Sequence, residues 1–356
     1  MKDHLIVSFG PRGEIARHSE GAFLRLNDGR ILFVYSQFRH SFHDNAASDL
    51  FACYSSDEGE TFTEPELFLP ASLYGVRNVM SVSLMRMANG DLGVFYLVKH
   101  PDDGTNSFHL SRSRDEGKTF YKHVPVSLRD RKAFCVVNND RVIRLSSGRI
   151  LAPIAFHRSG VNEEGKWYFD YHGYASFLYS DDDGETWKES RDIVYPPFTH
   201  SETGLQEPGA IELKNGALYC YCRTDKLCHY EFFSMDGGDT FTTPQPSRFS
   251  APDSPLHIVR RPDNGHLLAI WNPIPKYNGR VTTKVNLGRT PFVYATSADE
   301  GKTWSEAQII EDNPDCGYCY PAVFFTNDGA MLLSYCAGGP EDGLCLARTT
   351  IRKIAL

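Results

Sequence analysis

Apolar residues in this chain fall into short runs separated by tight-turn signals. Six times an Asn-Gly, Asp-Gly or Ser-Gly pair lies between two apolar runs, as in NDGRILFVYS and KNGALYCYCR. Such pairs are among the strongest short signals for a β-hairpin. The six turn glycines are Gly29, Gly90, Gly148, Gly216, Gly265 and Gly329. The pattern therefore predicts six hairpins and almost no helix.

A second repeat, Ser-x-Asp-x-Gly-x-Thr-aromatic, follows five of the six hairpins. Its copies begin at Ser55, Ser113, Ser180, Ser234 and Ser297. The aspartate can accept hydrogen bonds from amides of its own turn, and the glycine can adopt a positive φ at little cost. Because five equivalent carboxylates cannot all reach one site, we expect these aspartates to be structural.

The two repeats combine into a unit of strand, tight turn, strand, strand, Asp-containing turn and strand. Six four-stranded antiparallel units in succession are typical of a propeller, whose radial repetition protects most sheet edges. The sixth unit lacks the Asp-containing phrase, and the N-terminal run HLIVSF supplies a strand that closes the ring. We therefore predict one all-β domain over residues 1–356, a six-bladed β-propeller.

Composition narrows the possible partners. The 356 residues are 41% hydrophobic, with mean hydropathy −0.37 and net charge −8, and no basic stripe is visible. We expect no nucleic-acid or membrane partner, since no apolar run approaches the ~18 residues of a membrane span. Nine cysteines, many inside strand-like runs, suit buried thiols and a cytoplasmic location. The CGYC stretch lacks a second ligand pair, so we expect neither metal nor cofactor.

The Asp-containing phrases on six four-stranded units resemble the Asp boxes of the sialidase (neuraminidase) superfamily, and this resemblance covers nearly the whole chain. It implies an exo-acting glycoside hydrolase that cleaves a terminal acidic sugar, such as sialic acid, by a retaining mechanism. It also implies a glycan or sialoside as the partner and requires no cofactor. Asp boxes also occur in propellers that cleave other glycans or only bind them.

Candidate site residues are expected where the inner strands begin, because a propeller usually binds ligands over its axis. About nine residues before each hairpin glycine, a strand-length step, lie Glu20, Ser81, Asn139, Glu207, Leu256 and Tyr320. Two acids and a phenol are unusual at strand starts that serve only packing. We include Asn139 and Glu20 among the predicted substrate contacts.

Two of these segments resemble the catalytic segments of sialidases. LQEPGAIELKNG, with Glu207, resembles the segment of the family's glutamate base, and GYCYPAVFFTNDG, with Tyr320, resembles that of its nucleophilic tyrosine. The chemistry is consistent, because a neutral phenol is not repelled by the carboxylate at the anomeric carbon of sialic acid. A phenol of pKa ~10 needs a base, which the resemblance assigns to Glu207.

The resemblance also implies three arginines that hold the substrate carboxylate by bidentate hydrogen bonds. Arg223 and Arg289 match two of them. Arg17 lies about two residues before the expected place of the first, where Ser19 or Glu20 stands instead. Arg77, at the start of the second blade, is the alternative.

The family's acid/base aspartate lies in the loop after the first hairpin, here RHSFHDNAASD. Asp44 is the best match and Asp49 the second.

Two other functions stay open: a glycosidase for another sugar that uses Glu20 and Glu207 as its acid and base, and a glycan-binding propeller without catalysis. Three polar or aromatic loop residues are candidates for a sugar-stacking wall: Trp167, Tyr168 and His172.

Overall fold

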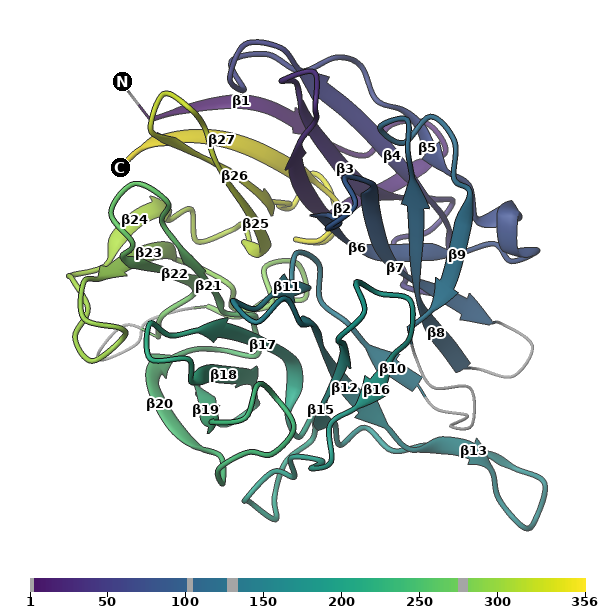
Figure 1. Cartoon of the computed structure of the whole chain (residues 1–356), viewed down its shortest axis with the longest axis vertical. Coiled ribbons are helices and arrows are strands. Elements are labelled where there is room, and N and C mark those ends of the chain that lie inside the picture. The colour runs from purple at the N-terminus through teal and green to yellow at the C-terminus, as the bar shows by residue number, and fades with distance from the viewer. Residues whose placement is uncertain (1–2, 101–104, 127–133, 275–280) are drawn as a thin grey trace.

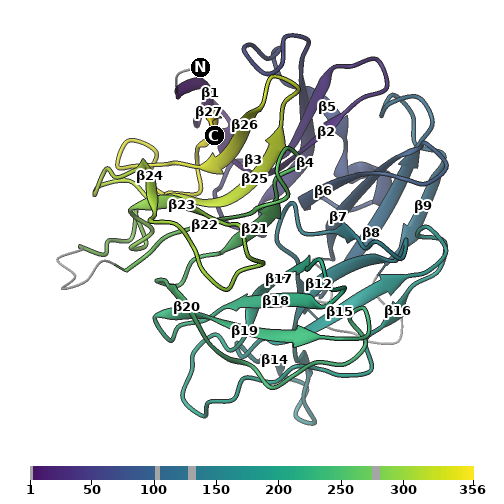
Figure 2. The same ribbon diagram turned by 60° about the vertical axis from the view of Figure 1, so that its left-hand side comes forward.

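The computed structural model describes residues 3–100, 105–126, 134–274 and 281–356. Six antiparallel sheets are arranged radially around an axis, and the chain passes through them in order, as the colour sequence in Figure 1 shows. Figure 2 gives the same arrangement from a second direction. The predicted all-β, six-bladed propeller is confirmed. Among the described residues, no helix is long and apolar enough to cross a membrane.

Each blade begins with a strand at the axis and ends with a strand at the rim. Blade 1 contains β2 (Ile15–Arg25), β3 (Ile31–Arg39), β4 (Ala47–Ser55) and β5 (Glu66–Leu69), with a short 3-10 helix η1 (Ala71–Tyr74) after it. Blade 2 contains β6 (Val79–Arg86), β7 (Leu92–His100), β8 (Thr105–Ser113) and β9 (Lys122–Pro125). Blade 3 contains a divided inner strand, β10 (Phe134–Val136) and β11 (Ile143–Arg144), then β12 (Ile150–His157), β15 (Tyr174–Ser180) and β16 (Lys188–Glu189).

The other three blades are more regular. Blade 4 contains β17 (Gln206–Glu212), β18 (Leu218–Arg223), β19 (Cys228–Ser234) and β20 (Gln245–Ser250). Blade 5 contains β21 (His257–Arg260), β22 (Leu267–Trp271), β23 (Phe292–Ser297) and β24 (Gln308–Glu311). Blade 6 contains β25 (Cys319–Phe325), β26 (Ala330–Cys336), β27 (Thr349–Ala355) and β1 (His4–Phe9).

The ring closes by pairing of the two ends of the chain. β1 is antiparallel to β27 and forms the outermost strand of blade 6, as the sequence predicts (Figure 1). This pairing joins N- and C-terminal residues in one sheet. Closure therefore uses main-chain hydrogen bonds as well as packing between blades 1 and 6.

The hydrophobic core is a ring of six layers, each lying between two neighbouring blades. Six clusters of buried apolar side chains contain residues from blades 1 and 2, 2 and 3, 3 and 4, 4 and 5, 5 and 6, and 6 and 1. Each sheet therefore buries both faces, and the axis itself is left to polar side chains. This arrangement explains how charged residues gather at the centre of the molecule.

The Asp-containing phrases form the turns expected from their sequence. In the first, Asp57 Oδ1 accepts a hydrogen bond from the Thr61 amide at 2.9 Å, and Oδ2 accepts one from the Thr61 hydroxyl at 2.6 Å. The same two bonds recur in the other four copies. The hydrogen bonds from Thr119 lower the pKa of Asp115 to about 2. These carboxylates are thus held in their turns.

The glycine of the phrase has a second role that the sequence pattern did not indicate. Gly184 has φ +87°, and a Cβ there would lie 2.7 Å from Leu110 in blade 2. Gly59 has φ +83°, and its Cβ would lie 2.5 Å from Leu332 in blade 6. Both glycines thus allow a close approach between neighbouring blades as well as the left-handed turn.

Candidate active site

A repeated bulge at the start of the inner strands positions the candidate site. In β17, Gln206 pairs with Arg223 and Gly209 pairs with Tyr221, so β17 has one residue more than β18. β2, β6 and β25 carry the same irregularity. The first bulged residue has φ between 45° and 58° in Glu20, Ser81, Glu207 and Tyr320. Positive φ costs free energy for these residue types, and at a bulge it re-aims the side chain.

The four bulged residues line one small cavity of about 70 Å³ over the axis. The structure thus brings together four of the six residues that the comparison of strand starts singled out. In blade 3, the residue with the same positive φ is Asp140, directly after the predicted Asn139. Leu256, the predicted position in blade 5, is not among the residues with positive φ.

Tyr320 and Glu207 are in direct contact. The Tyr320 hydroxyl donates a hydrogen bond of 2.8 Å to Glu207 Oε1, and both side chains are buried. Burial and the negative charge of Glu207 raise the pKa of Tyr320 well above its usual value, although nearby Arg289 and Arg223 oppose the shift. The phenol is therefore neutral in the free protein and has a carboxylate placed to accept its proton.

Arg223 and Arg289 lie against this pair. Arg223 Nη1 donates to Glu207 Oε1 at 2.7 Å, and its Nε lies 2.7 Å from an oxygen of Asp253. The Arg289 guanidinium is 5.5 Å from the centre of the Tyr320 ring. Its Nη1 donates to Cys319 Sγ at 3.1 Å and its Nε to the Asp253 carbonyl oxygen at 3.2 Å. Two cations thus lie beside the phenol: Arg289 is buried, and the Arg223 side chain is 13% exposed.

Arg17 lies beside the site despite its early position in the sequence. An additional register shift between Ile15 and Arg17 in β2 accommodates the extra residues. The Arg17 guanidinium contacts Asp44 Oδ1 at 2.5 Å and Glu20 Oε1 at 3.4 Å. It also lies 4.4 Å from the centre of the Phe38 ring and is almost completely buried. Spacing alone could not predict this placement, because bulges change the length of chain per strand step.

Asp44 reaches the edge of the same cavity from the loop between β3 and β4. Its side chain is 59% exposed. The Asn78 amide of blade 2 fixes this loop by donating to the carbonyl oxygens of Asp44 and Ala46 at 3.0 and 2.5 Å. The surrounding protein raises the pKa of Asp44 by desolvation, but the positive charges of Arg17 and Lys99 outweigh this, and the pKa lies below its usual value.

Asp49, the alternative acid, is occupied by structural contacts. One carboxylate oxygen accepts from the Ala71 amide at 2.8 Å, and the other accepts from Arg39 at 2.6 Å. Asp49 is buried and does not line the axial cavity. The geometry therefore favours Asp44 over Asp49.

Glu20 faces Glu207 across the cavity and has an unusual pKa. Burial and the negative charges of Asp44 and Glu207 raise the pKa of Glu20 to about 7, although Arg17 and a hydrogen bond from Ser81 oppose the shift. The Ser81 hydroxyl donates to Glu20 Oε2 at 3.1 Å. Glu20 therefore exchanges its proton near neutral pH.

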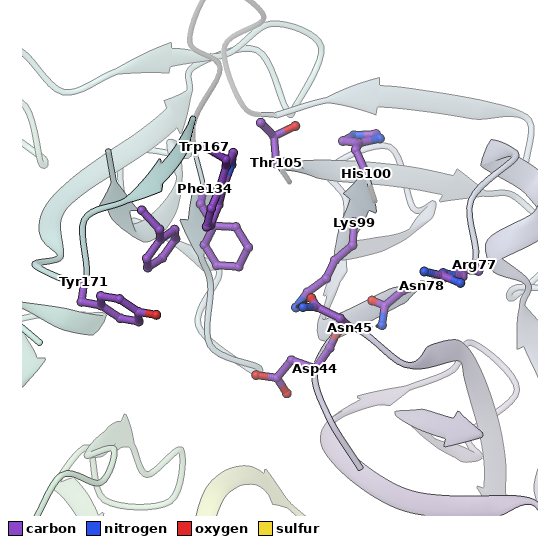
Figure 3. A pocket seen from close by; sticks show the side chains of 11 residues that line it. Asp44, Asn45, Arg77, Asn78, Lys99, His100, Thr105, Phe134, Trp167 and Tyr171 are labelled. Atoms are coloured by element: carbon purple, nitrogen blue, oxygen red, sulfur yellow. Dashed lines mark hydrogen bonds between the residues drawn. The ribbon is translucent and has the colours of Figure 1, made fainter. Parts of the chain in front are cut away.

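The remaining predicted residues lie around this centre. Asn139 is fully buried, and its amide donates to the backbone carbonyls of Gly21 and Tyr320 at 2.7 and 3.4 Å. Asn139 thus connects three blades across the axis. Arg77 is exposed and lines a neighbouring pocket of about 440 Å³ together with Trp167 (Figure 3).

Lys99 and Asn78 were missed by the sequence analysis. Lys99 lies two residues after Leu97, which occupies in β7 the place that Arg223 occupies in β18. An alignment of the second strand of each blade, extended by two residues beyond the position of Arg223, would have found Lys99. Asn78 offered no comparable signal, because its role depends on a contact between two blades.

Comparison with known proteins agrees with the repeats and the fold. The model of the BNR repeat-like domain matches residues 75–333, most of the chain. This chain belongs to the BNR repeat-like family. An anhydrosialidase from Macrobdella decora is 26% identical over 195 residues, which are 53% of this chain and 23% of that protein. The match to this chain therefore spans less than a quarter of the length of that curated relative.

Solved structures show the same propeller. An intramolecular trans-sialidase from Ruminococcus gnavus superposes with a TM-score of 0.71 at 14% identity, covering 98% of this family member and 96% of that chain. A protein of unknown function from Dyadobacter fermentans gives a TM-score of 0.70 at 20% identity, covering 99% of both chains. These superpositions show that the chain has the six-bladed propeller fold of these structures.

Proposed function

We propose that the protein is a sialidase-type glycoside hydrolase that removes a terminal acidic sugar by a retaining mechanism. The observation that carries this proposal is the 2.8 Å hydrogen bond from the Tyr320 hydroxyl to Glu207, beside the guanidinium groups of Arg223 and Arg289. A phenol next to a base and beside cations suits attack on an anomeric carbon that carries a carboxylate. The similarity to the M. decora anhydrosialidase gives independent support.

In the first step, Glu207 accepts the Tyr320 proton while the phenolic oxygen bonds to the anomeric carbon. The bond from that carbon to the leaving oxygen breaks, and Asp44 donates its proton to the leaving oxygen. In the second step, water attacks the anomeric carbon, Asp44 takes a proton from the water, and the bond to Tyr320 breaks. Glu207 then returns the proton to the phenol, so that the enzyme regains its starting state.

Substrate binding prepares Asp44 for this role. In the free protein, the Arg17 charge holds Asp44 in its ionised form. A substrate carboxylate that pairs with Arg17, Arg223 and Arg289 would compete with Asp44 for Arg17. The pKa of Asp44 would then rise, and the carboxyl group could carry the proton that the leaving oxygen needs. Binding and acid catalysis are thus coupled through one arginine.

Replacement of the nucleophile tests the proposal. Tyr320→Phe should lower kcat for an aryl sialoside by more than ~10³-fold while the non-hydrolysable sugar 2-deoxy-2,3-dehydro-N-acetylneuraminic acid still binds. Tyr318→Phe, a buried neighbour in the same segment, is the matched control and should keep most of the activity. A 2,3-difluorosialic acid probe should also label the peptide that contains Tyr320. Normal turnover by Tyr320→Phe would refute the assignment.

A second candidate rests on Glu20. Its carboxyl group has a pKa of about 7 and lines the same cavity as Glu207, which suits an acid and base pair acting on another sugar. In that case Glu20→Gln, rather than Tyr320→Phe, would abolish hydrolysis of some neutral aryl glycoside. A protein that binds glycans but cleaves no aryl glycoside or sialoside would instead be a binding propeller.

A further inference from the structure

A second pocket, which we call the side pocket, lies beyond Asp44 and adjoins the axial cavity. Its volume is about 440 Å³, compared with about 70 Å³ for the axial cavity. Both spaces are lined by Asp44, Lys99 and Phe134, so they adjoin one another. Neither Tyr320 nor Glu207 lines the side pocket.

The position of the side pocket beyond Asp44 relates it to the leaving group of the substrate. A general acid must contact the oxygen between the cleaved sugar and the leaving group, so Asp44 marks the boundary between the two. The cleaved sugar lies on the side of Tyr320, where the new bond forms. The space on the other side of Asp44 is therefore available to the leaving group. This step rests on the proposed function.

One wall of the side pocket is aromatic and open to a ligand. Trp167 and Tyr171 are 52% and 70% exposed, although large aromatic side chains usually bury more of their surface. Trp167 lies on β14 (Trp167–Phe169), which pairs with β13 (Ser159–Val161) in a hairpin that projects from blade 3 (Figure 1). Phe169 supports Trp167 by stacking at 5.8 Å between ring centres. Exposed rings of this kind provide flat apolar faces for a sugar ring.

The opposite wall is cationic, as Figure 3 shows. Arg77 is exposed, and no acidic partner for its guanidinium is found in the described part of the chain. Lys99 lies deeper, with its ammonium 5.5 Å from the Phe134 ring centre. Asp44 is the one acid among the described residues that line the pocket, and Arg17 already pairs with it. Among the described residues that line the pocket, positive charge thus exceeds negative charge.

We propose that the side pocket binds the leaving group, and that this group is a sugar ring with an anionic substituent, a carboxylate or a sulfate. The ring lies against Trp167, and Arg77 pairs with the anion. The preferred substrate is therefore an acidic sugar attached to a second charged sugar rather than to a neutral one. A guanidinium that has no acidic partner among the described residues, across from an aromatic wall, is the arrangement that such a ligand requires.

Binding of leaving groups alone tests this inference without any need for turnover. Lactose, lactose 6′-sulfate and the 6′-carboxylate analogue of lactose would be titrated into the full chain and followed by NMR. We expect at least one of the two anionic sugars to bind at least about fivefold more tightly than lactose. High salt should reduce this difference in affinity, because it screens the charges. The relative affinities of the sulfate and the carboxylate then identify the substituent.

Three variants locate the effect. Arg77→Gln should reduce affinity for the anionic sugars to that for lactose, and Trp167→Ala should weaken binding of all three. Arg248→Gln, a change of an exposed arginine in β20, is the matched control and should leave all three affinities unchanged. An anionic preference that survives Arg77→Gln, or equal binding of charged and neutral sugars, would overturn the inference.

Binding of 2-deoxy-2,3-dehydro-N-acetylneuraminic acid separates the remaining outcomes. Arg77→Gln and Trp167→Ala should leave its affinity unchanged, since it has no leaving group. If both variants weaken it, the side pocket holds an arm of the cleaved sugar and the inference is wrong. If anionic lactose analogues bind through Arg77 but sialosides are never cleaved, the proposed function fails while the anion-binding pocket stands.

Discussion

The variant Glu20→Gln measures how much a buried, ionised carboxylate at the propeller axis lowers the free energy of unfolding. Burial and two neighbouring acids raise the pKa of Glu20 from 4.5 to about 7. Between these two pH values, the folded protein holds a proton that the unfolded chain has released. The free energy of unfolding therefore falls as pH rises through this window, and the loss is complete above the folded-state pKa.

The difference between the two pKa values corresponds to about 3 kcal/mol, because one pKa unit corresponds to 1.36 kcal/mol. Glutamine is neutral at every pH, and it retains an oxygen for Arg17 and a polar group for Ser81. Relative to the wild type, Glu20→Gln should thus gain about 3 kcal/mol between pH 4.5 and pH 8. For 356 residues this gain raises Tm by roughly 4 °C.

The measurement is Tm by circular dichroism from pH 4 to pH 8.5 for the wild type and Glu20→Gln. In the difference between the two Tm values, the contributions of groups that titrate in both proteins cancel. Glu306→Gln, a change of an exposed glutamate, is the control and should not reproduce the gain of Glu20→Gln. A difference that is independent of pH, or one that grows toward acid, would refute the argument that burial suppresses ionisation of Glu20.

Two further predictions concern the framework of the site. Gly184→Ala should lower the free energy of unfolding by about 2–4 kcal/mol in urea titrations, from left-handed strain and a contact with Leu110. Gly148→Ala, with φ +92° but no atom within 4 Å of the new Cβ, should cost only about 1 kcal/mol; equal losses would exclude the packing contribution. Asn78→Ala removes both hydrogen bonds that fix the loop of the proposed acid, and it should lower kcat ~10- to 100-fold with little change in KM. Unchanged kcat would show that the loop needs no such support.

Local signals in the sequence were sufficient to predict the blades. The turn pairs and the Asp-containing phrases specify strand, turn and strand through contacts within about ten residues, so that their interpretation needs no tertiary information. Closure of the ring by residues 4–9 was also predictable, since a sixth sheet without its outer strand leaves an edge unpaired. The equivalent places of Tyr320 and Glu207 in two blades predicted that both lie near the axis, and the resemblance to sialidases predicted their contact.

The arrangement of charges around the axis was decided by the tertiary structure. Bulges in β2 bring Arg17 to Asp44 in spite of its early position. In blade 3, the residue with the matching positive φ is Asp140 rather than Asn139. The partners of Arg77, or their absence, likewise depend on which blades and loops meet. The sequence thus determined the repeated unit, because its turns are local, whereas pairings and pKa values arise from groups in different blades, whose distances no local pattern encodes.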